Sequence, residues 1–240
     1  MQRGPSDFFV FGASSELAQR LFEQERAWLL ANVRRLVLVQ RSREVASAYQ
    51  GFDVQLEIAD AADPRAFATA LEQIVQRHAQ AKQHMHVFPT YGKFNWSTAR
   101  RPHFVPSQDG FQINLNARLQ IIEAFRSFAA NTTFHLLGSL LSNFPYLGDY
   151  AMSMWYVNQL PSHPSYGDLD LRVYNLGGMK TRFWDHSKEN TASNPFLHRE
   201  IPTRQLLQAM ASDQRGVTNI YPTTLSRALS WIARRGVRLL

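Results

Sequence analysis

The feature that most limits the fold of this chain is a recurring pattern of short apolar segments, each five or six residues long. Helical patterns separate most of them. Short apolar runs are typical of parallel strands that are buried on both faces. The sequence therefore predicts an α/β fold, with one parallel sheet of about seven strands and helices on both faces. The predicted strands are 7–12, 36–40, 54–58, 84–88, 133–138, 171–176 and 217–221, and the main predicted helices are 13–30, 64–81, 110–128, 150–160 and 223–235.

Composition is ordinary for a folded domain and excludes some chemistry. With 240 residues, 45% of them hydrophobic and 19% charged, the chain can bury one large core. It has no cysteine, which excludes disulfides and thiolate chemistry. No run of 18 apolar residues exists, and the segment before the first strand lacks the apolar region of a signal peptide. We therefore expect a cytoplasmic protein.

The net charge of +7 is concentrated near the end of the sequence. Residues 199–240 contain seven arginines and two acidic residues, which accounts for +5 of it. This region is either a solvated basic surface or an attraction site for an anionic partner. The predicted helix 223–235 is amphipathic, so packing onto the domain or a partner subunit and peripheral contact with an anionic membrane both remain open. Nucleic acid is not expected, because no recognition motif accompanies the charge.

The first predicted strand leads directly into a turn and a helix. Strand, tight turn and helix N-terminus form the arrangement that binds dinucleotides, because the turn amides and the helix dipole hold a pyrophosphate. The expected cofactor-binding positions in this turn are Gly12, Ser14, Ser15 and Leu17. Glu16 complicates this prediction, since its carboxylate either lies near the phosphates or points to solvent in the first helical turn.

Residues 139–154 carry the most informative spacing. Ser139 is followed eleven positions later by Tyr150, and Asn114 lies 25 positions before Ser139. The pattern resembles the short-chain dehydrogenase/reductase family, which places a serine and then Tyr-x-x-x-Lys at this spacing. The resemblance spans nearly the whole chain and implies a single-domain Rossmann-like, doubly wound fold over residues 1–240. In this chain Met154 stands where the family has its lysine, with Ser153 before it.

The resemblance implies roles for three catalytic residues. Tyr150 would donate the proton to a substrate carbonyl, and Ser139 would hydrogen-bond the same oxygen. Asn114 would hold a water of the proton relay. The family's lysine lowers the pKa of the tyrosine and holds the nicotinamide ribose, and a methionine can do neither.

Further cofactor positions follow from the ends of the predicted strands. Arg41 follows the second strand, where an arginine suits the 2′-phosphate of NADP(H) better than NAD. By resemblance, Asp60 would contact the adenine, and Gly92 is the one residue kept from the family's Asn-Asn-Ala-Gly segment. Gly177 and Thr181 match the Pro-Gly-x-x-x-Thr segment that closes over the nicotinamide.

Several positions depart from the family pattern. Only Gly12 remains of the three glycines in the first turn, since Glu16 and Ala18 stand at the other two. Tyr91 replaces an alanine and adds a bulky ring beside the expected cofactor path. Leu176 replaces the proline before Gly177. By the resemblance, these substitutions fall at positions expected to contact the cofactor rather than at the expected proton donor.

The remaining expectations concern metals, the substrate and assembly. His84 and His86 share one strand face, but no third ligand lies at a telling spacing, so no metal site is expected. Residues 182–215 correspond to the family's variable substrate lid. A small-molecule substrate is implied, as is a homodimer or homotetramer formed through the helices that begin near Asn114 and Tyr150.

Three hypotheses account for the missing lysine. The chain is an NADP(H)-dependent oxidoreductase that is attenuated or specialised, with Lys93 or Lys180 as candidates to supply the charge. Alternatively, it is a pseudoenzyme that keeps the fold for binding or assembly. In the third hypothesis Tyr150 and Ser139 perform a non-redox reaction, such as a dehydration or an isomerisation.

Overall fold

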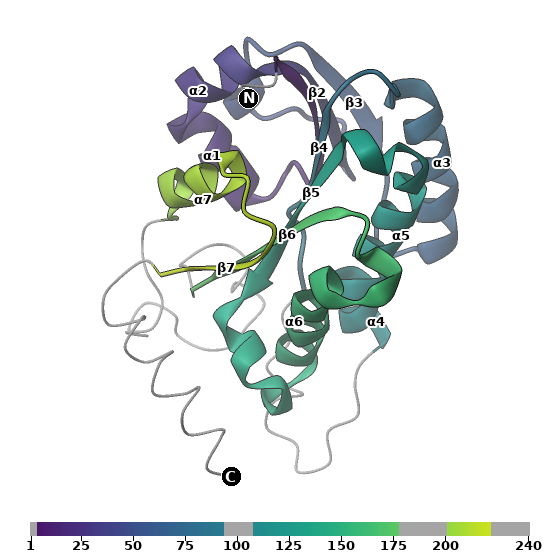
Figure 1. Ribbon diagram of the computed structural model, residues 1–240. Helices are drawn as coiled ribbons and strands as arrows, with labels where there is room; N and C mark the ends of the chain where they lie inside the picture. The colour runs from purple at the N-terminus through teal and green to yellow at the C-terminus, as the bar shows by residue number, and fades with distance from the viewer. Residues whose placement is uncertain (1–3, 94–107, 178–200, 222–240) are drawn as a thin grey trace.

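A computed structural model describes residues 4–93, 108–177 and 201–221, and these residues form one sheet flanked by helices (Figure 1). The strand order is β3-β2-β1-β4-β5-β6-β7, and every neighbouring pair is parallel. The predicted α/β fold with a doubly wound parallel sheet is confirmed. The strands are β1 (Ser6–Phe11), β2 (Val33–Gln40), β3 (Val54–Ile58), β4 (Met85–Pro89), β5 (Thr132–Ser139), β6 (Asp170–Leu176) and β7 (Gly216–Ile220).

Helices cover both faces of the sheet. Figure 1 shows α1, α2 and α7 on one side of it, with α3 and α5 on the other. The helices are α1 (Glu16–Gln24), α2 (Arg26–Asn32), α3 (Pro64–His78), α4 (Gln108–Phe111), α5 (Ala117–Ala124), α6 (Asp149–Gln159) and α7 (Thr203–Ala211), and a π-helical turn, η2 (Gln112–Asn116), joins α4 to α5. Short 3-10 turns lie at Ser47–Tyr49, Arg126–Asn131, Leu140–Asn143, Pro145–Leu147, Leu160–Ser162 and Pro164–Tyr166.

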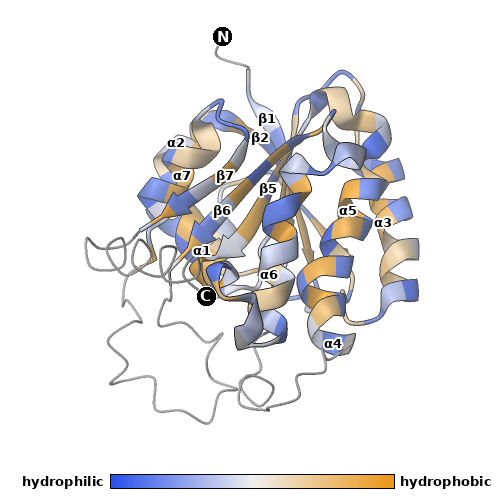
Figure 2. Ribbon diagram, turned by 60° about the horizontal axis from the view of Figure 1, so that its bottom comes forward, coloured by the Kyte–Doolittle hydropathy of each residue, from blue (hydrophilic) through white to orange (hydrophobic). Residues whose placement is uncertain are grey.

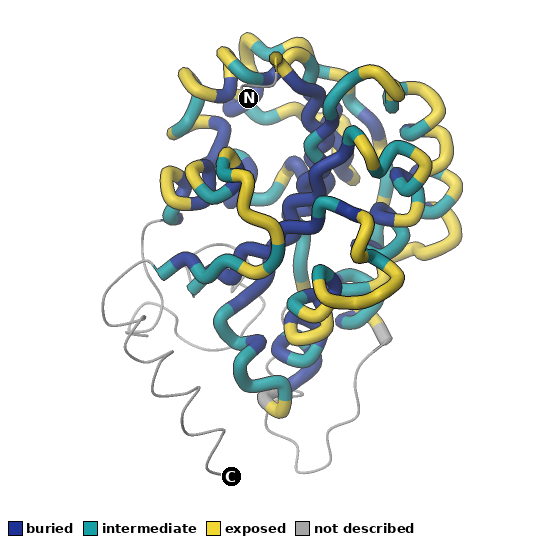
Figure 3. Tube along the Cα trace, in the orientation of Figure 1, coloured by how far each residue is buried: buried dark blue, intermediate teal, exposed yellow. Residues whose placement is uncertain are grey.

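Each strand divides its apolar side chains between two cores, because successive side chains point to opposite faces. In β1, Phe8 and Val10 belong to the core beneath α1, α2 and α7. Phe9 and Phe11 belong to the core beneath α3, α5 and α6. Figure 2 shows apolar residues on the helix faces that meet the sheet, and Figure 3 shows that the central strands are buried.

Helix boundaries follow local chemistry, and some differ from the sequence prediction. Asp63 caps α3 as predicted, since its Oδ1 accepts hydrogen bonds from the amides of Arg65 and Ala66 at 3.1 and 3.0 Å. The single helix predicted for 13–30 is two helices, because the chain turns at Glu25. The predicted helix 110–128 is likewise interrupted by η2.

Part of the segment predicted as a substrate lid is a packed helix. Helix α7 buries Leu206, Leu207 and Met210 in the core on the α1 side. Thr203, at its start, donates to the side-chain oxygen of Gln24 at 2.7 Å. Residues 203–211 therefore belong to the body of the fold.

Within the described ranges, none of the helices combines the length and the apolar character that crossing a membrane requires.

The buried carboxylate of Asp7 links the start of β1 to β2 through ion pairs with two arginines of β2. The Asp7 side chain is fully buried and receives Nε and Nη2 of Arg34 at 2.9 and 2.7 Å. Arg35 Nη2 donates to the same carboxylate at 2.6 Å and to the carbonyl of His78 at the end of α3. The charges compensate one another, which is what allows an aspartate to be buried here.

We expect Asp7→Ala to lower the free energy of unfolding by about 3 kcal/mol, because it leaves two arginines without their anion. This is the low end for a buried pair, since Arg34 is half exposed. Urea denaturation at neutral pH measures it. Glu23→Ala, which removes an exposed ion pair with Arg20, is the control and should cost about 0.5 kcal/mol or less. If both substitutions lower the free energy of unfolding by the same amount, the buried ion pairs of Asp7 contribute no more than an exposed pair does.

Candidate active site

The residues singled out in the sequence gather along one edge of the sheet. Parallel strands present their carboxyl ends at the same edge, and six of the predicted positions stand at or just after such an end. In sheet order from β3 to β6, that edge carries Asp60, Arg41, Gly12, Gly92, Ser139 and Gly177. Thr181 and Lys180 lie outside the described residues, as does the predicted helix 223–235.

The turn after β1 lies where the strand order reverses, between β1 and β4. Gly12 has a φ of +79°, and a Cβ on it would lie 3.0 Å from the amide nitrogen of Tyr91. The hydroxyl of Thr90 donates to the carbonyl of Gly12 at 2.8 Å and receives a hydrogen bond from Ser15 Oγ at 2.8 Å. The turn is therefore closed against the end of β4, and glycine is required by both its φ and its close contact.

Ser15 is the N-cap of α1, since its Oγ accepts from the amide of Ala18 at 3.2 Å. Ser14 is exposed, and Leu17 is buried against the sheet. The amides of the first helical turn face the edge where Gly12 lies, as they do in anion-binding helix termini. Glu16 begins the helix, where an acidic side chain suits the dipole.

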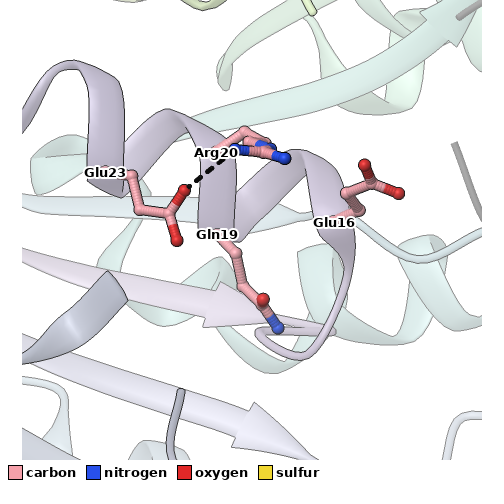
Figure 4. A pocket seen from close by; sticks show the side chains of 4 residues that line it. All are labelled: Glu16, Gln19, Arg20 and Glu23. Carbon is pink, nitrogen blue, oxygen red and sulfur yellow. Dashed lines mark hydrogen bonds and ion pairs between the residues drawn. The ribbon is translucent and has the colours of Figure 1, made fainter. Parts of the chain in front are cut away.

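A shallow depression lies along the exposed face of α1. Glu16, Gln19, Arg20 and Glu23 line an open depression of about 330 Å³ along one helix face (Figure 4). Arg20 and Glu23 form an exposed ion pair in it at 3.5 Å. The depression carries none of the catalytic residues predicted from the sequence, so we do not regard it as the active site.

Arg41 and Asp60 follow β2 and β3, and both are exposed. The Gln40 side chain shapes the loop after Arg41 by donating to the carbonyls of Ser42 and Glu44 at 2.9 and 2.7 Å. Asp60 accepts from the amide of Ala62 at 3.0 Å. Arg41 therefore stands beside the Gly12 turn, because β2 is the neighbour of β1.

Tyr91 lies directly against the Gly12 turn and is partly buried. Its ring packs against the core on the α3 side, 6.4 Å from the ring of Phe67 in an edge-on contact. Its hydroxyl oxygen is buried and has no hydrogen-bond partner among the described residues. Burial raises the pKa of this phenol. The partly buried ring packs against the core next to the switch point.

Ser139 and Tyr150 are brought together although ten residues separate them in the chain. Ser139 ends β5 and is buried, and Tyr150 lies in the first turn of α6. The hydroxyl of Ser139 lies close enough to the Tyr150 phenol to lower its pKa, and Ser139 Oγ also accepts from the amide of Leu141 at 3.2 Å. Burial raises the pKa of that phenol, while the Arg118 guanidinium and the Ser139 hydrogen bond lower it. Two hydroxyl groups thus converge at the sheet edge.

Met154 follows Tyr150 by one helical turn and is 1% exposed. It lies in the apolar core between the sheet, α5 and α6, together with Ala117 and Val157. No cation stands at this position, and the methionine contributes apolar packing.

Asn114 is fully buried in the π-helical turn η2. Its side chain accepts from the amide of Lys93 and donates to the carbonyl of Lys93, both at 2.8 Å. These two bonds hold the segment after β4 against the helix. Lys93, one candidate for the missing charge, is exposed, and its Nζ lies 3.5 Å from Asp109.

Arg118 was not singled out from the sequence, yet it is a buried cation among the described residues near the site. It is 2% exposed, and its charge acts on the phenols of Tyr91 and Tyr150. It follows Asn114 by four residues, which is the only sequence signal that it shares a helix face with that residue. An arginine within an apolar helical stripe is the pattern that could have revealed it.

Of the two histidines noted in the sequence, His86 on β4 belongs to a hydrogen-bond chain, whereas His84 precedes β4 and its Nε2 lies 3.3 Å from Thr133 Oγ1. His86 Nδ1 lies 2.8 Å from His135 Nε2, and His135 Nδ1 lies 2.8 Å from the Tyr174 hydroxyl. Burial lowers the pKa of His135 well below its usual range, and Arg172 acts in the same direction. Over the described ranges, no group of three or more potential metal ligands lies together.

No family model and no curated protein matches the chain. Solved structures are similar to it in fold. A short chain dehydrogenase from Burkholderia cenocepacia J2315, in complex with NADP, is 14% identical with a TM-score of 0.73, over 99% of this chain and 97% of that chain. A short-chain dehydrogenase from Sphingobium yanoikuyae, in complex with NADPH, is 17% identical with a TM-score of 0.63, over 97% and 93%. NADPH-bound carbonyl reductase from chicken fatty liver is 13% identical with a TM-score of 0.64, over 90% and 97%.

At these identities the comparisons establish the fold. It is the Rossmann-like arrangement of short-chain dehydrogenase structures, with one parallel seven-stranded sheet between helices.

We expect Gly12→Ala to destabilise the protein more than Gly216→Ala. Both glycines have positive φ, which costs an alanine about 1 kcal/mol. Only at Gly12 would the new Cβ meet backbone, since nothing lies within 4 Å at Gly216. Thermal unfolding of both variants measures the difference, which should exceed about 1 kcal/mol. If both variants lose the same stability, the Gly12 turn can move away from Tyr91 to accommodate a Cβ, and the close contact does not require glycine.

Proposed function

We propose that this chain is an NADP(H)-dependent oxidoreductase that acts on a small carbonyl or hydroxyl substrate. The observation that carries the proposal is the placement of Ser139 at the carboxyl end of β5 and of Tyr150 in the first turn of α6, which brings the two hydroxyl-bearing side chains to the same edge of the sheet. Ligands of doubly wound sheets bind at this edge, near the point where the strand order reverses. The solved structures with this fold that carry NADP or NADPH support the same choice of cofactor.

The residues at the switch point fit a dinucleotide. The Gly12 turn leads directly into the N-terminus of α1, whose first amides would bind a pyrophosphate in this proposal. Arg41 is exposed beside this turn and suits the 2′-phosphate of NADP(H). Asp60, Gly92, Gly177 and Thr181 are the further proposed contacts. When bound, the nicotinamide cofactor supplies or accepts the hydride.

Ser139 and Tyr150 perform the proton chemistry in this proposal. Both hydroxyls donate toward the substrate oxygen, and Tyr150 transfers its proton to that oxygen during reduction. Because burial raises the pKa of Tyr150, the phenol is protonated at neutral pH. Asn114 keeps the segment after β4 in place beside this pair.

The position of Met154 argues for an attenuated or specialised enzyme. The loss of one preorganised charge typically costs about 10²–10³ in rate. A pseudoenzyme is the second candidate, and the burial of Met154 in an apolar core favours it. A dehydratase or isomerase that uses Tyr150 and Ser139 is the third, and it would be independent of nicotinamide.

Assembly is part of the proposal. We expect a homodimer or homotetramer in which α6 contributes to the interface, because Trp155 and Tyr156 on this helix are 38% and 44% exposed. Exposed aromatic residues on one helix are typical of interface cores.

NADPH at millimolar concentration should raise the melting temperature, because a ligand of the native state stabilises it. Tyr150→Phe should keep this shift and lose carbonyl reduction by about 10² or more, since the proton donor is gone. Thermal shift and NADPH oxidation with a panel of small carbonyl compounds measure the two effects. Absence of any shift with NADPH or NADH would remove the oxidoreductase proposal.

The Arg41→Ala variant should bind NADPH about tenfold more weakly, while its affinity for NADH stays unchanged, because only NADPH carries the 2′-phosphate. Arg77→Ala is the matched control, since that exposed arginine lies in the last turn of α3, at the opposite edge of the sheet. Isothermal titration of the three proteins measures the affinities. If both substitutions weaken NADPH binding equally, Arg41 is no 2′-phosphate ligand.

A further inference from the structure

A hydrogen-bond chain of two histidines and a tyrosine crosses three neighbouring strands of the sheet. His86 lies on β4, His135 on β5 and Tyr174 on β6. The chain runs on the face that α1 and α7 cover, because Tyr174 belongs to the core of that face and the His86 ring lies 4.5 Å from the ring of Phe8 in the same core. The proposed proton chemistry does not use these side chains.

Each contact in the chain has room for one hydrogen. His86 Nδ1 lies 2.8 Å from His135 Nε2, and His135 Nδ1 lies 2.8 Å from the hydroxyl of Tyr174. A neutral imidazole has one N–H and one acceptor nitrogen. The chain is therefore complete in either direction: Tyr174 donates to His135 and His135 to His86, or His86 donates to His135 and His135 to Tyr174.

A pair of charged histidines does not fit this geometry. An imidazolium has a hydrogen on both nitrogens. If His86 and His135 were both charged, two N–H groups would point at each other across 2.8 Å, so the hydrogen bond between them would be lost. With a single proton the bond remains, because the other histidine still accepts. While the chain is intact the pair thus binds one proton at most, whereas two separate imidazoles bind two.

The surroundings of His135 also oppose a charge on it. His135 is 0% exposed, and Arg172 stands opposite it in the register of β5 and β6. The carboxylate of Asp170 accepts from Arg172 at 3.0 and 2.8 Å and lies 3.7 Å from Arg215, so its charge is already paired. Burial lowers the pKa of His135, and Arg172 and His84 act in the same direction.

The remaining elements around the pair add no anion to it. On the β4 side, the His84 ring lies 4.7 Å from the His86 ring, so a proton on one opposes a proton on the other. The charge of Asp213, after α7, acts on Arg172. Arg204 of α7 is exposed, and the charged residues Glu16, Arg20 and Glu23 of α1 line its outer face. The two helices turn apolar side chains to this core, namely Leu21, Phe22, Leu206, Leu207 and Met210.

We propose that His86, His135 and Tyr174 form an acid-sensitive clamp across β4, β5 and β6: the chain holds while the two imidazoles share no more than one proton, and mild acid breaks it by supplying the second. This inference does not depend on the proposed function.

The direction of the pH dependence follows from proton linkage. In the unfolded chain both histidines bind protons below about pH 6.5, and the folded chain binds at least one proton fewer. Lowering the pH therefore favours the unfolded state. For one withheld proton, the unfolding equilibrium constant rises about tenfold for each pH unit below this range. At neutral pH both imidazoles are uncharged and the clamp is intact.

Urea denaturation from about pH 7.5 to about pH 5 measures this dependence. In His135→Gln the amide oxygen can accept from a charged His86, so the pair no longer withholds a proton. We expect the pH dependence of this variant to be weaker than that of the wild type by about tenfold in equilibrium constant per pH unit. His163→Gln is the matched control, since His163 is exposed, and it should keep the wild-type dependence.

NMR spectroscopy of the folded wild-type protein provides a second measurement. Long-range ¹H–¹⁵N correlation spectra of ¹⁵N-histidine-labelled protein distinguish neutral from charged imidazoles, and the His86→Gln variant identifies the signals of the pair. At about pH 5.5, below the usual pKa of histidine, we expect His86 and His135 to keep one neutral imidazole between them.

Two outcomes would overturn the proposal. One is a pH dependence as steep in His135→Gln as in the wild type, because the withheld proton would then belong to another group. The other is a folded protein in which His86 and His135 are both charged. If His135→Gln does not fold, the spectra of the wild-type protein decide. Neither measurement requires a cofactor, so the result is separate from that of the NADPH experiments.

Discussion

Everything in this structure depends on the parallel pairing of β1 with β2 on one side and with β4 on the other. Parallel pairing requires each connection to return across a face of the sheet, which places helices on both faces and all strand ends at one edge. At the switch point between β1 and β4, the turn at Gly12 touches the backbone of Tyr91. The proposed cofactor site and the proposed catalytic pair lie along this edge because of that pairing.

The proposed catalytic pair lies in an electrostatic environment to which three elements contribute. Ser139 comes from β5, Tyr150 from α6 and Arg118 from α5, so the site requires the packing of both helices on the sheet. Burial makes the phenol a weaker acid, and the hydrogen bond and the guanidinium oppose that effect. Proton transfer near neutral pH depends on the balance between these influences. A site of this design is sensitive to the spacing between α5 and α6.

The sequence by itself determined the strand and helix ladder, since short apolar runs and N-caps such as Asp63 act locally. It also placed Gly12, Arg41, Asp60 and Ser139 near strand ends, because those positions follow directly from the strands. Only the tertiary structure decided the break at Glu25, the burial of α7 and the turn of the Tyr91 ring into the core, because these depend on packing between distant segments. The same holds for Arg118, which looks like a surface arginine in the sequence. Its burial, and its hydrogen bond to the carbonyl of Tyr91, exist only once the helix that carries it packs against the segment after β4.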